Sequence, residues 1–218
     1  MKSAKKEELR IFRFAELGRA LVYRMLLRLR LRNVNPSIIA NNCTAGIIYH
    51  DLGLKFRSPT INLYFETEDY YKFLRSLEYY LHCIPEPVAD DPHPFPVGVL
   101  RKEEEEVKVY FMHYASFEEA RDKWVERGAR VNLDNLYVLW EYPSTLHVKD
   151  RIWQQFRSLD FKHKRLLTDP VDFSDEEVVP IGIYRGNYRP GLILDYVPGK
   201  YGTRYLNRFD YVRFLNQK

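Results

Sequence analysis

The residues whose types and spacing best suit chemistry are two successive asparagines and a cysteine. Asn41, Asn42 and Cys43 follow the short apolar run 37–40, which has the β-branched character of a buried strand. Small residues come next, and apolar side chains then recur at helical spacing as far as Gly53, a typical helix stop. A polar turn between a buried strand and a helix is where open α/β sheets bind ligands. We therefore expect a functional site at this turn.

The thiol of Cys43 suggests covalent catalysis. A helix N-terminus would stabilise its thiolate, His113 could accept its proton, and Asn132 or Asp134 could orient the imidazole. The alternative is structural: Cys43 is a small residue packed under a turn, and His113 is a hydrogen-bonded residue at a strand end.

The amides suggest a second chemistry, which is the binding of hydroxyl-rich ligands such as sugars. Asn41 and Asn42 end one expected strand, and His113 with Tyr114 ends another. Amides at strand ends also commonly satisfy neighbouring backbone groups, so this pattern does not by itself separate binding from structure.

A second polar group repeats the amide chemistry near two arginines. Asn132, Asp134 and Asn135 lie just before the apolar run 136–140, and Arg127 and Arg130 precede them and could bind a phosphate. The alternative for both arginines is a solvated surface position. The residues 132–135 would share an edge with Asn41 only if the connection to the next strand folds back.

Standard catalytic signatures are missing from the sequence. It contains no G-x-x-x-x-G-K-[ST], no G-x-G-x-x-G after the first strand, no H-E-x-x-H, no G-x-S-x-G and no C-x-x-C pair. The sequence therefore predicts no metal site and no particular cofactor.

The remaining elements alternate between strands and helices. We expect strands over 59–65, 97–100, 107–114, 136–140, 165–167 and 178–184, and helices over 66–83, 116–128, 147–158 and 204–216. The short charged joint between 97–100 and 107–114 requires an antiparallel pair. This pattern predicts a three-layer α/β domain over residues 33–218, with a mixed, mostly parallel central sheet and helices on both faces.

The positive charge lies at the N-terminus. The 218 residues carry a net charge of +4, but residues 1–32 alone hold ten Lys/Arg against three Glu. A helix from Lys5 to about Leu29 would carry Leu21, Met25 and Leu29 on one apolar stripe. This helix either packs on the domain through its stripe, with arginines in solvent, or binds an anionic membrane surface. Nucleic-acid binding is not expected, because no such motif accompanies the basic residues.

Composition favours a cytoplasmic protein. Two cysteines, Cys43 and Cys83, make no disulfide framework, no secretory signal precedes them, and no apolar run reaches the length of a membrane span. An aromatic content of 15% indicates that the body of the domain is ordered.

Several segments together resemble the DUF1919 family of bacterial proteins. They are IIANNCTAGIIYHDLGL, SPTINLYFETEDYYKFLRSLEYYL, PVGVL, VYFMHYASFEEARDKWVERGARVNLDN and RYLNRFDYVRFLN, and the resemblance covers roughly residues 8–216. Members are often labelled exopolysaccharide or capsular polysaccharide biosynthesis proteins. The resemblance implies a sugar nucleotide or saccharide as substrate.

This sequence departs from the family pattern beside the cysteine. The family usually has S-N-N-C followed by a bulky aromatic residue, whereas Ala40 and Thr44 stand at those positions here. If the aromatic side chain lines a ligand pocket in the family, the pocket of this protein is more open. His113, Tyr114, Asn132, Asp134 and Asn135 match as they stand. The polar cluster at the strand ends, taken together with the resemblance, leads us to expect a transferase that acts on a sugar or sugar phosphate, with His113 as general base. A Cys43-dependent acyl transferase or hydrolase, and a non-catalytic membrane-recruited partner of a synthesis complex, are the alternatives.

Overall fold

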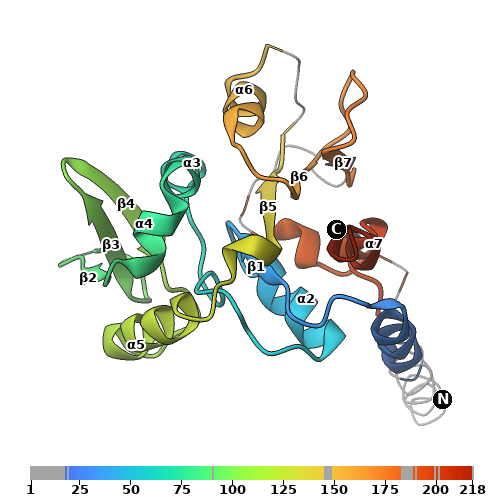
Figure 1. Ribbon diagram of the computed structural model, residues 1–218, viewed down its shortest axis with the longest axis horizontal. Coiled ribbons are helices and arrows are strands. Elements are labelled where there is room, and N and C mark those ends of the chain that lie inside the picture. Colours follow the sequence, from blue (N-terminus) through green and yellow to red (C-terminus); the bar gives the residue numbers. More distant parts are fainter. Residues whose placement is uncertain are drawn as a thin grey trace, which may run out of the picture.

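The computed structural model describes residues 18, 20–89, 91–144, 149–182, 189, 191–198, 200 and 202–217. Its central element is a sheet of four parallel strands in the order β1-β5-β6-β7 (Figure 1). These strands are β1 (Ser37–Ala40), β5 (Leu136–Tyr142), β6 (Lys164–Thr168) and β7 (Val178–Pro180). Ser37 pairs with Leu136 and Ala40 with Leu139, so the carboxyl ends of β1 and β5 meet at one edge.

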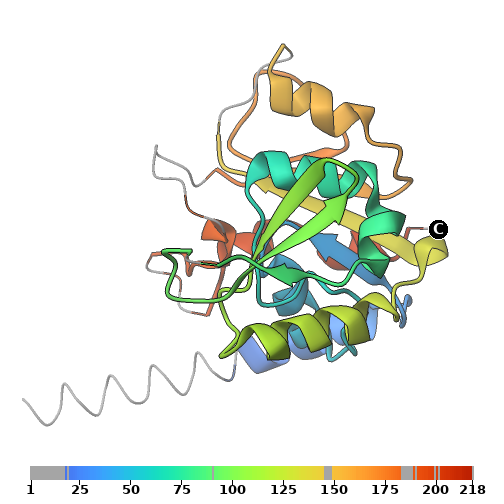
Figure 2. The same cartoon turned by 90° about the vertical axis from the view of Figure 1, so that its left-hand side faces the viewer.

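A second sheet contains the antiparallel strands. It has the order β2-β3-β4, with β2 (Glu86–Pro87), β3 (Val97–Lys102) and β4 (Glu105–Tyr110). Figure 2 views this hairpin beside α5. The α/β class with parallel and antiparallel strands is thus confirmed, and the structure distributes the two kinds of strand over two sheets.

Two apolar clusters cover the two faces of the parallel sheet, because alternate residues of a strand point to opposite faces. Ile39, Val138 and Trp140 belong to one cluster, and Ile38, Tyr137 and Leu139 to the other. The first cluster contains side chains of α3 (Thr67–Arg75), α4 (Leu77–His82), α5 (Phe117–Gly128), α6 (Arg151–Ser158) and the β3–β4 hairpin. The second contains α2 (Thr44–Leu52), α7 (Tyr211–Leu215) and the short helical turns η2 (Leu192–Leu194) and η3 (Tyr205–Arg208).

Several local predictions are confirmed. β1 has the predicted bounds, and α2 ends at Gly53, whose φ of 67° is the left-handed conformation that glycine adopts readily. The Ser116 side chain accepts a hydrogen bond from the Glu119 backbone N–H at 3.1 Å and so caps α5. The Glu119 side chain in turn accepts from the Ala115 N–H at 3.4 Å, one residue before the N–H that a capping box would use.

Several predicted elements were wrong in their extent. The predicted strand 107–114 is β4, which ends at Tyr110, so His113 and Tyr114 follow this strand at a distance and do not end it. The predicted strand 59–65 forms only an isolated bridge between Tyr64 and Tyr110, since Asn62 has a left-handed φ of 63° that interrupts an extended chain. The predicted helix 66–83 breaks at Ser76, whose φ of −129° is not helical. The predicted helix 204–216 is divided between η3 and α7, because the Asp210 side chain starts a new helix by accepting from the Arg213 N–H.

The basic N-terminal segment is described only in part. Residues 20–30 are helical, and most of the earlier part of the predicted helix lies outside the described residues. Residues 147–148 of the predicted helix 147–158 and residues 183–184 of the predicted strand 178–184 also lie outside them. Asn216 ties the end of this helix to the C-terminal region, since its side chain accepts from the Arg32 N–H at 2.8 Å and donates to the Arg30 carbonyl at 2.9 Å.

Candidate functional site

Asn41 joins the carboxyl ends of β1 and β5. Its Nδ2 donates to the Glu141 carbonyl oxygen at 2.9 Å, and its Oδ1 accepts from the Glu141 backbone N–H at 2.8 Å. The Asn41 amide therefore imitates a backbone peptide and extends the parallel pairing by one step beyond Ala40. The side chain is only 2% exposed. Its two polar groups hold the sheet edge together, and its predicted contact with substrate hydroxyls stays a prediction.

Asn42 links the same edge to the start of α2. Its Oδ1 accepts hydrogen bonds from the Thr44 backbone N–H at 3.0 Å and the Thr44 hydroxyl at 2.6 Å. Its Nδ2 donates to the Glu141 carboxylate. Thr44, where the family has an aromatic residue, is itself buried, so its side chain lies inside this network.

Glu141 is the centre of the network and was missed by the sequence interpretation. Its carboxylate accepts from Asn42, from the Gly191 N–H at 3.1 Å and from the Ile193 N–H at 3.1 Å. It is 2% exposed, and burial of a carboxylate is strongly unfavourable unless hydrogen bonds of this kind replace its water. One acidic side chain thus fastens the η2 segment to the sheet edge. A signal existed in the sequence, because an acidic residue directly follows the apolar strand run that we ended at Trp140.

Cys43 lies at the N-cap position of α2, as expected, but its surroundings do not activate it. Its Sγ approaches the Leu63 carbonyl oxygen at 3.8 Å, a contact in which the protonated thiol donates. The pKa of the Cys43 thiol is raised to about 11, chiefly by burial and to a smaller extent by the negative charge of Glu141, while backbone hydrogen bonds at Leu63 and Asn62 oppose the rise. The thiol therefore stays protonated near neutral pH. The geometry favours the structural interpretation of Cys43 over the nucleophilic one.

His113 and Tyr114 lie between the Asn62–Leu63 segment and α5. The His113 backbone N–H donates to the Asn62 carbonyl at 3.3 Å, and the His113 side chain is exposed. The Tyr114 hydroxyl donates to the Ile61 carbonyl at 2.9 Å and accepts from Arg127 at 2.7 Å. Burial raises the pKa of Tyr114, and the charge of Arg127 partly offsets this rise. In the described part of the chain, no hydrogen bond joins Cys43 to His113.

Arg127 and Arg130 border a hollow of about 360 Å³ between α5 and the segment 54–56. The lining residues are Leu54, Lys55, Phe56, Lys123, Glu126, Arg127 and Arg130. Four of them are cationic and one is anionic. The Arg127 guanidinium lies 5.2 Å from the centre of the Phe56 ring, and Arg130 donates to the Phe56 carbonyl at 3.3 Å, so both arginines are held in place. Such a hollow is suited to a phosphorylated ligand.

The polar group 132–135 lies at the opposite end of the sheet. The Asn132 N–H donates to the Ser37 hydroxyl at the start of β1, and Asn135 exchanges amide hydrogen bonds with Asn33 at 2.8 and 3.0 Å. Asp134 shares the short helical turn η1 (Leu133–Asn135) with Asn135. The condition for a shared edge with Asn41 is not met, because these residues directly precede β5, which runs parallel to β1. The length of β5 separates the two ends by roughly 20 Å, so Asp134 is not placed to orient a base at the carboxyl edge.

Among the residues that the structure describes, no group of three or more His, Cys, Asp or Glu side chains has the arrangement of a metal site. None of the helices in this part of the chain combines the length and the apolar character that a bilayer crossing requires.

The fold is that of an α/β protein with a central parallel sheet of four strands and a separate antiparallel sheet, and the network around Glu141 closes one edge of the parallel sheet. Comparison with known families then gives a specific assignment. The family model described as "Domain of unknown function (DUF1919)" matches residues 18–216. An uncharacterized protein of Haemophilus influenzae is 32% identical over 190 residues, which are 87% of this chain and 88% of that protein. The chain therefore belongs to the DUF1919 family, as the resemblance of its segments indicated.

Proposed function

We propose that this protein is a transferase of bacterial exopolysaccharide or capsular polysaccharide biosynthesis, and that it binds a sugar phosphate or sugar nucleotide. The observation that carries the proposal is the basic hollow beside α5. Lys55, Lys123, Arg127 and Arg130 surround it, with Glu126 as the single acidic lining residue. A phosphate or diphosphate group complements this charge. The volume of the hollow, about 360 Å³, falls within the range of small-ligand sites. The proposal includes a cytoplasmic location, where such activated donors are available.

The residues near the hollow suggest separate roles. Arg127 and Arg130 would contact phosphate oxygens, since their guanidinium groups are already oriented by Tyr114 and by the Phe56 carbonyl. His113 adjoins Tyr114 and is exposed, so it is available as a general base for an acceptor hydroxyl. Asn41, Asn42 and Glu141 would act indirectly, by holding the carboxyl edge and the η2 segment in place.

Ligand-induced stabilisation tests the binding step. The protein would be melted with sugar nucleotides, with sugar 1-phosphates, and with the corresponding free sugars and inorganic phosphate as controls. A ligand at about 100 times its Kd adds about 2.7 kcal/mol to the stability of the folded state, which gives a clear rise in Tm. We expect Arg127→Ala to weaken binding at least tenfold. Arg121→Ala is the matched control, because Arg121 lies on the same helix, where it pairs with Asp122.

Turnover tests the catalytic role separately. His113→Ala should fold and bind ligand, because none of the described contacts needed for folding involves the exposed imidazole. It should lose transfer activity, because the proposed general base is missing. Equal turnover by His113→Ala and the unchanged protein would contradict the assigned base. A flat Tm across all phosphorylated sugars would contradict the proposed substrate class.

A further inference from the structure

The helix over residues 20–30 shows its apolar face to solvent. Leu21, Val22, Met25, Leu26 and Leu29 are between 54% and 80% exposed. At 100° per residue, these five positions cover an arc of ~140° on one side of the helix. Scattered exposed leucines are common in proteins, but five large apolar side chains on one helix face form a contiguous patch. We refer to these five residues as the N-terminal stripe.

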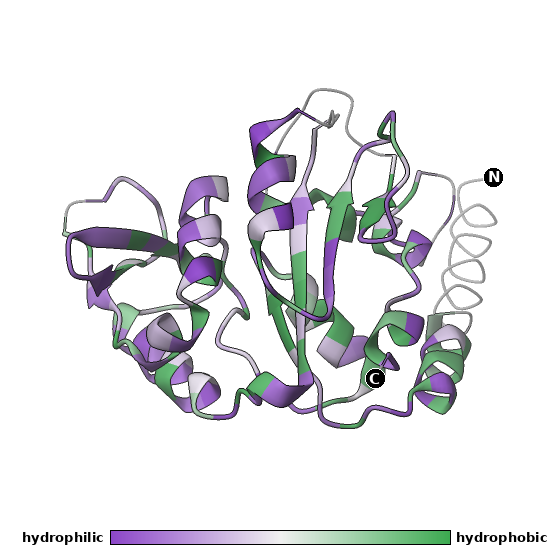
Figure 3. Ribbon diagram, turned by 45° about the horizontal axis from the view of Figure 1, so that its top comes forward, coloured by the Kyte–Doolittle hydropathy of each residue, from purple (hydrophilic) through white to green (hydrophobic). Residues whose placement is uncertain are grey.

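The opposite side of the same helix is bound to the body of the protein. Leu27 is buried in the cluster around α2, and Leu31 packs against that cluster. Arg24 forms an ion pair with the buried Asp51 carboxylate at 2.9 Å. Figure 3 shows hydrophobic and hydrophilic residues side by side on this helix.

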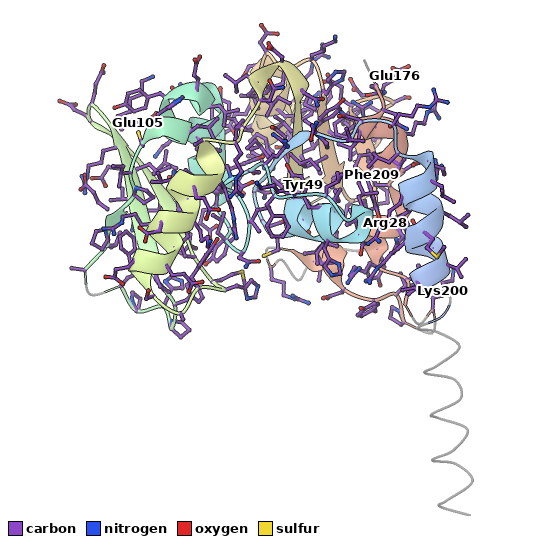
Figure 4. All side chains as sticks on the ribbon, turned by 60° about the horizontal axis from the view of Figure 1, so that its bottom comes forward. Arg28, Tyr49, Glu105, Glu176, Lys200 and Phe209 are labelled. Carbon is purple, nitrogen blue, oxygen red and sulfur yellow. The ribbon has the colours of Figure 1, made fainter. Side chains whose placement is uncertain are left out.

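Arg28 fixes the orientation of the helix further. Its Nε donates to the Asp51 carbonyl oxygen at 3.0 Å and its guanidinium lies over Gly53, at the C-terminus of α2, where a positive charge is favourable (Figure 4). A Cβ at Gly53 would lie 3.1 Å from the Arg28 Cζ, so glycine leaves room for this contact. Arg24, Leu27 and Arg28 thus face the protein, while the stripe faces outward.

We propose that the N-terminal stripe binds the surface of an anionic lipid bilayer. The charge of the segment identifies the occupant: residues 1–32 hold ten Lys/Arg against three Glu, and the stripe lies within this segment. A basic segment with an exposed apolar face combines the two terms that hold helices at an anionic membrane interface. A second copy of the chain fits less well, because it would bring two segments of the same positive charge together. This inference is independent of the transferase activity.

Vesicle flotation with the full chain tests the proposal. The protein would be mixed with vesicles of phosphatidylcholine alone and with vesicles that contain about one third phosphatidylglycerol. We expect binding to the anionic vesicles, weaker binding at high salt, and at least a tenfold loss of binding for Met25→Gln combined with Leu29→Gln. The two substitutions remove the apolar contact and leave the charge unchanged.

The matched control is Ile84→Gln combined with Val125→Gln, which changes two exposed apolar residues elsewhere in the protein. The control should bind like the unchanged chain, and circular dichroism should show that both double variants fold. Equal vesicle binding by the stripe variant would overturn the proposal. A second result would also overturn it. In that result the unchanged protein does not bind anionic vesicles, sedimentation shows that it forms a concentration-dependent dimer, and the stripe variant forms no dimer.

Discussion

The two ends of the parallel sheet are both built from asparagines, yet they differ in one important respect. At the amino end, Asn33 and Asn135 exchange hydrogen bonds, and Asn33 also donates to the Tyr137 hydroxyl at 3.0 Å. At the carboxyl end, Asn41 and Asn42 both bind Glu141. The first network is neutral and partly exposed to water, whereas the second surrounds a buried carboxylate.

This difference determines how each end should respond to mutation. A neutral amide that loses a partner near the surface can bind water instead, so the loss is small. A buried carboxylate and the groups that donate to it have no such substitute. The amino end therefore resembles an ordinary structural junction of chain segments, while the carboxyl end depends on a single charged side chain.

The largest effect is expected for Glu141→Ala. Removal of the carboxylate leaves the Asn42 amide and the backbone N–H groups of Gly191 and Ile193 buried without this acceptor. Each buried donor left without an acceptor costs about 1–3 kcal/mol, so we expect a loss of about 3–5 kcal/mol in the free energy of unfolding. Urea denaturation followed by circular dichroism measures it. Glu104→Ala, in the turn between β3 and β4, serves as the exposed acidic control and should change stability little. A Glu141 variant as stable as the control would remove the contrast between the two sheet ends.

The second prediction concerns the thiol next to this carboxylate. The pKa of Cys43 is raised from 9.0 to about 11, so at neutral pH its thiolate is about one hundredfold rarer than that of an unperturbed thiol. Iodoacetamide should therefore alkylate Cys43 very slowly at pH 7.5, and peptide mass spectrometry would separate this reaction from that of Cys83.

The sign of the pH dependence follows from the raised pKa. The folded protein holds the Cys43 proton more tightly than the unfolded chain, so this contribution to stability is complete below pH 9 and is lost as the pH rises through about 11. Cys43→Ser should lack this loss. Rapid alkylation of Cys43 at pH 7.5 in the folded state would return the nucleophile to consideration.

Local sequence patterns predicted the sheet edge well and its chemistry only in part. The apolar run before Asn41 and the helical spacing before Gly53 are local signals, and β1 and α2 follow them closely. The partner of both asparagines is one hundred residues away, and no local pattern reports such a pairing. In the sequence Glu141 is an ordinary polar residue at a strand end, and only the pairing of β1 with β5 brings it within hydrogen-bond distance of Asn41 and Asn42.

The N-terminal helix is a second case in which a local pattern predicts an element but not its contacts. Its periodic apolar residues predicted an amphipathic helix, and residues 20–30 are helical. Periodicity identifies two faces but does not say which face meets the protein. Asp51 and the C-terminus of α2 decide this by attracting Arg24 and Arg28, and these groups come from a distant part of the sequence.

The smallest and sharpest test compares one amide from each end of the sheet. Asn41→Ala removes a side chain that is 2% exposed and that satisfies both backbone groups of Glu141, so we expect a loss of about 2 kcal/mol. Asn135→Ala removes a partly exposed amide that binds Asn33 and the Asn35 carbonyl, and here water can replace the lost partner, so about 1 kcal/mol is expected. Denaturation of both variants under the same conditions gives the difference directly. A larger loss for Asn135→Ala would mean that the neutral junction, rather than the charged edge, holds the parallel sheet together. The double variant should lose the sum of the two single losses, because the two amides lie at opposite ends of the sheet and share no partner.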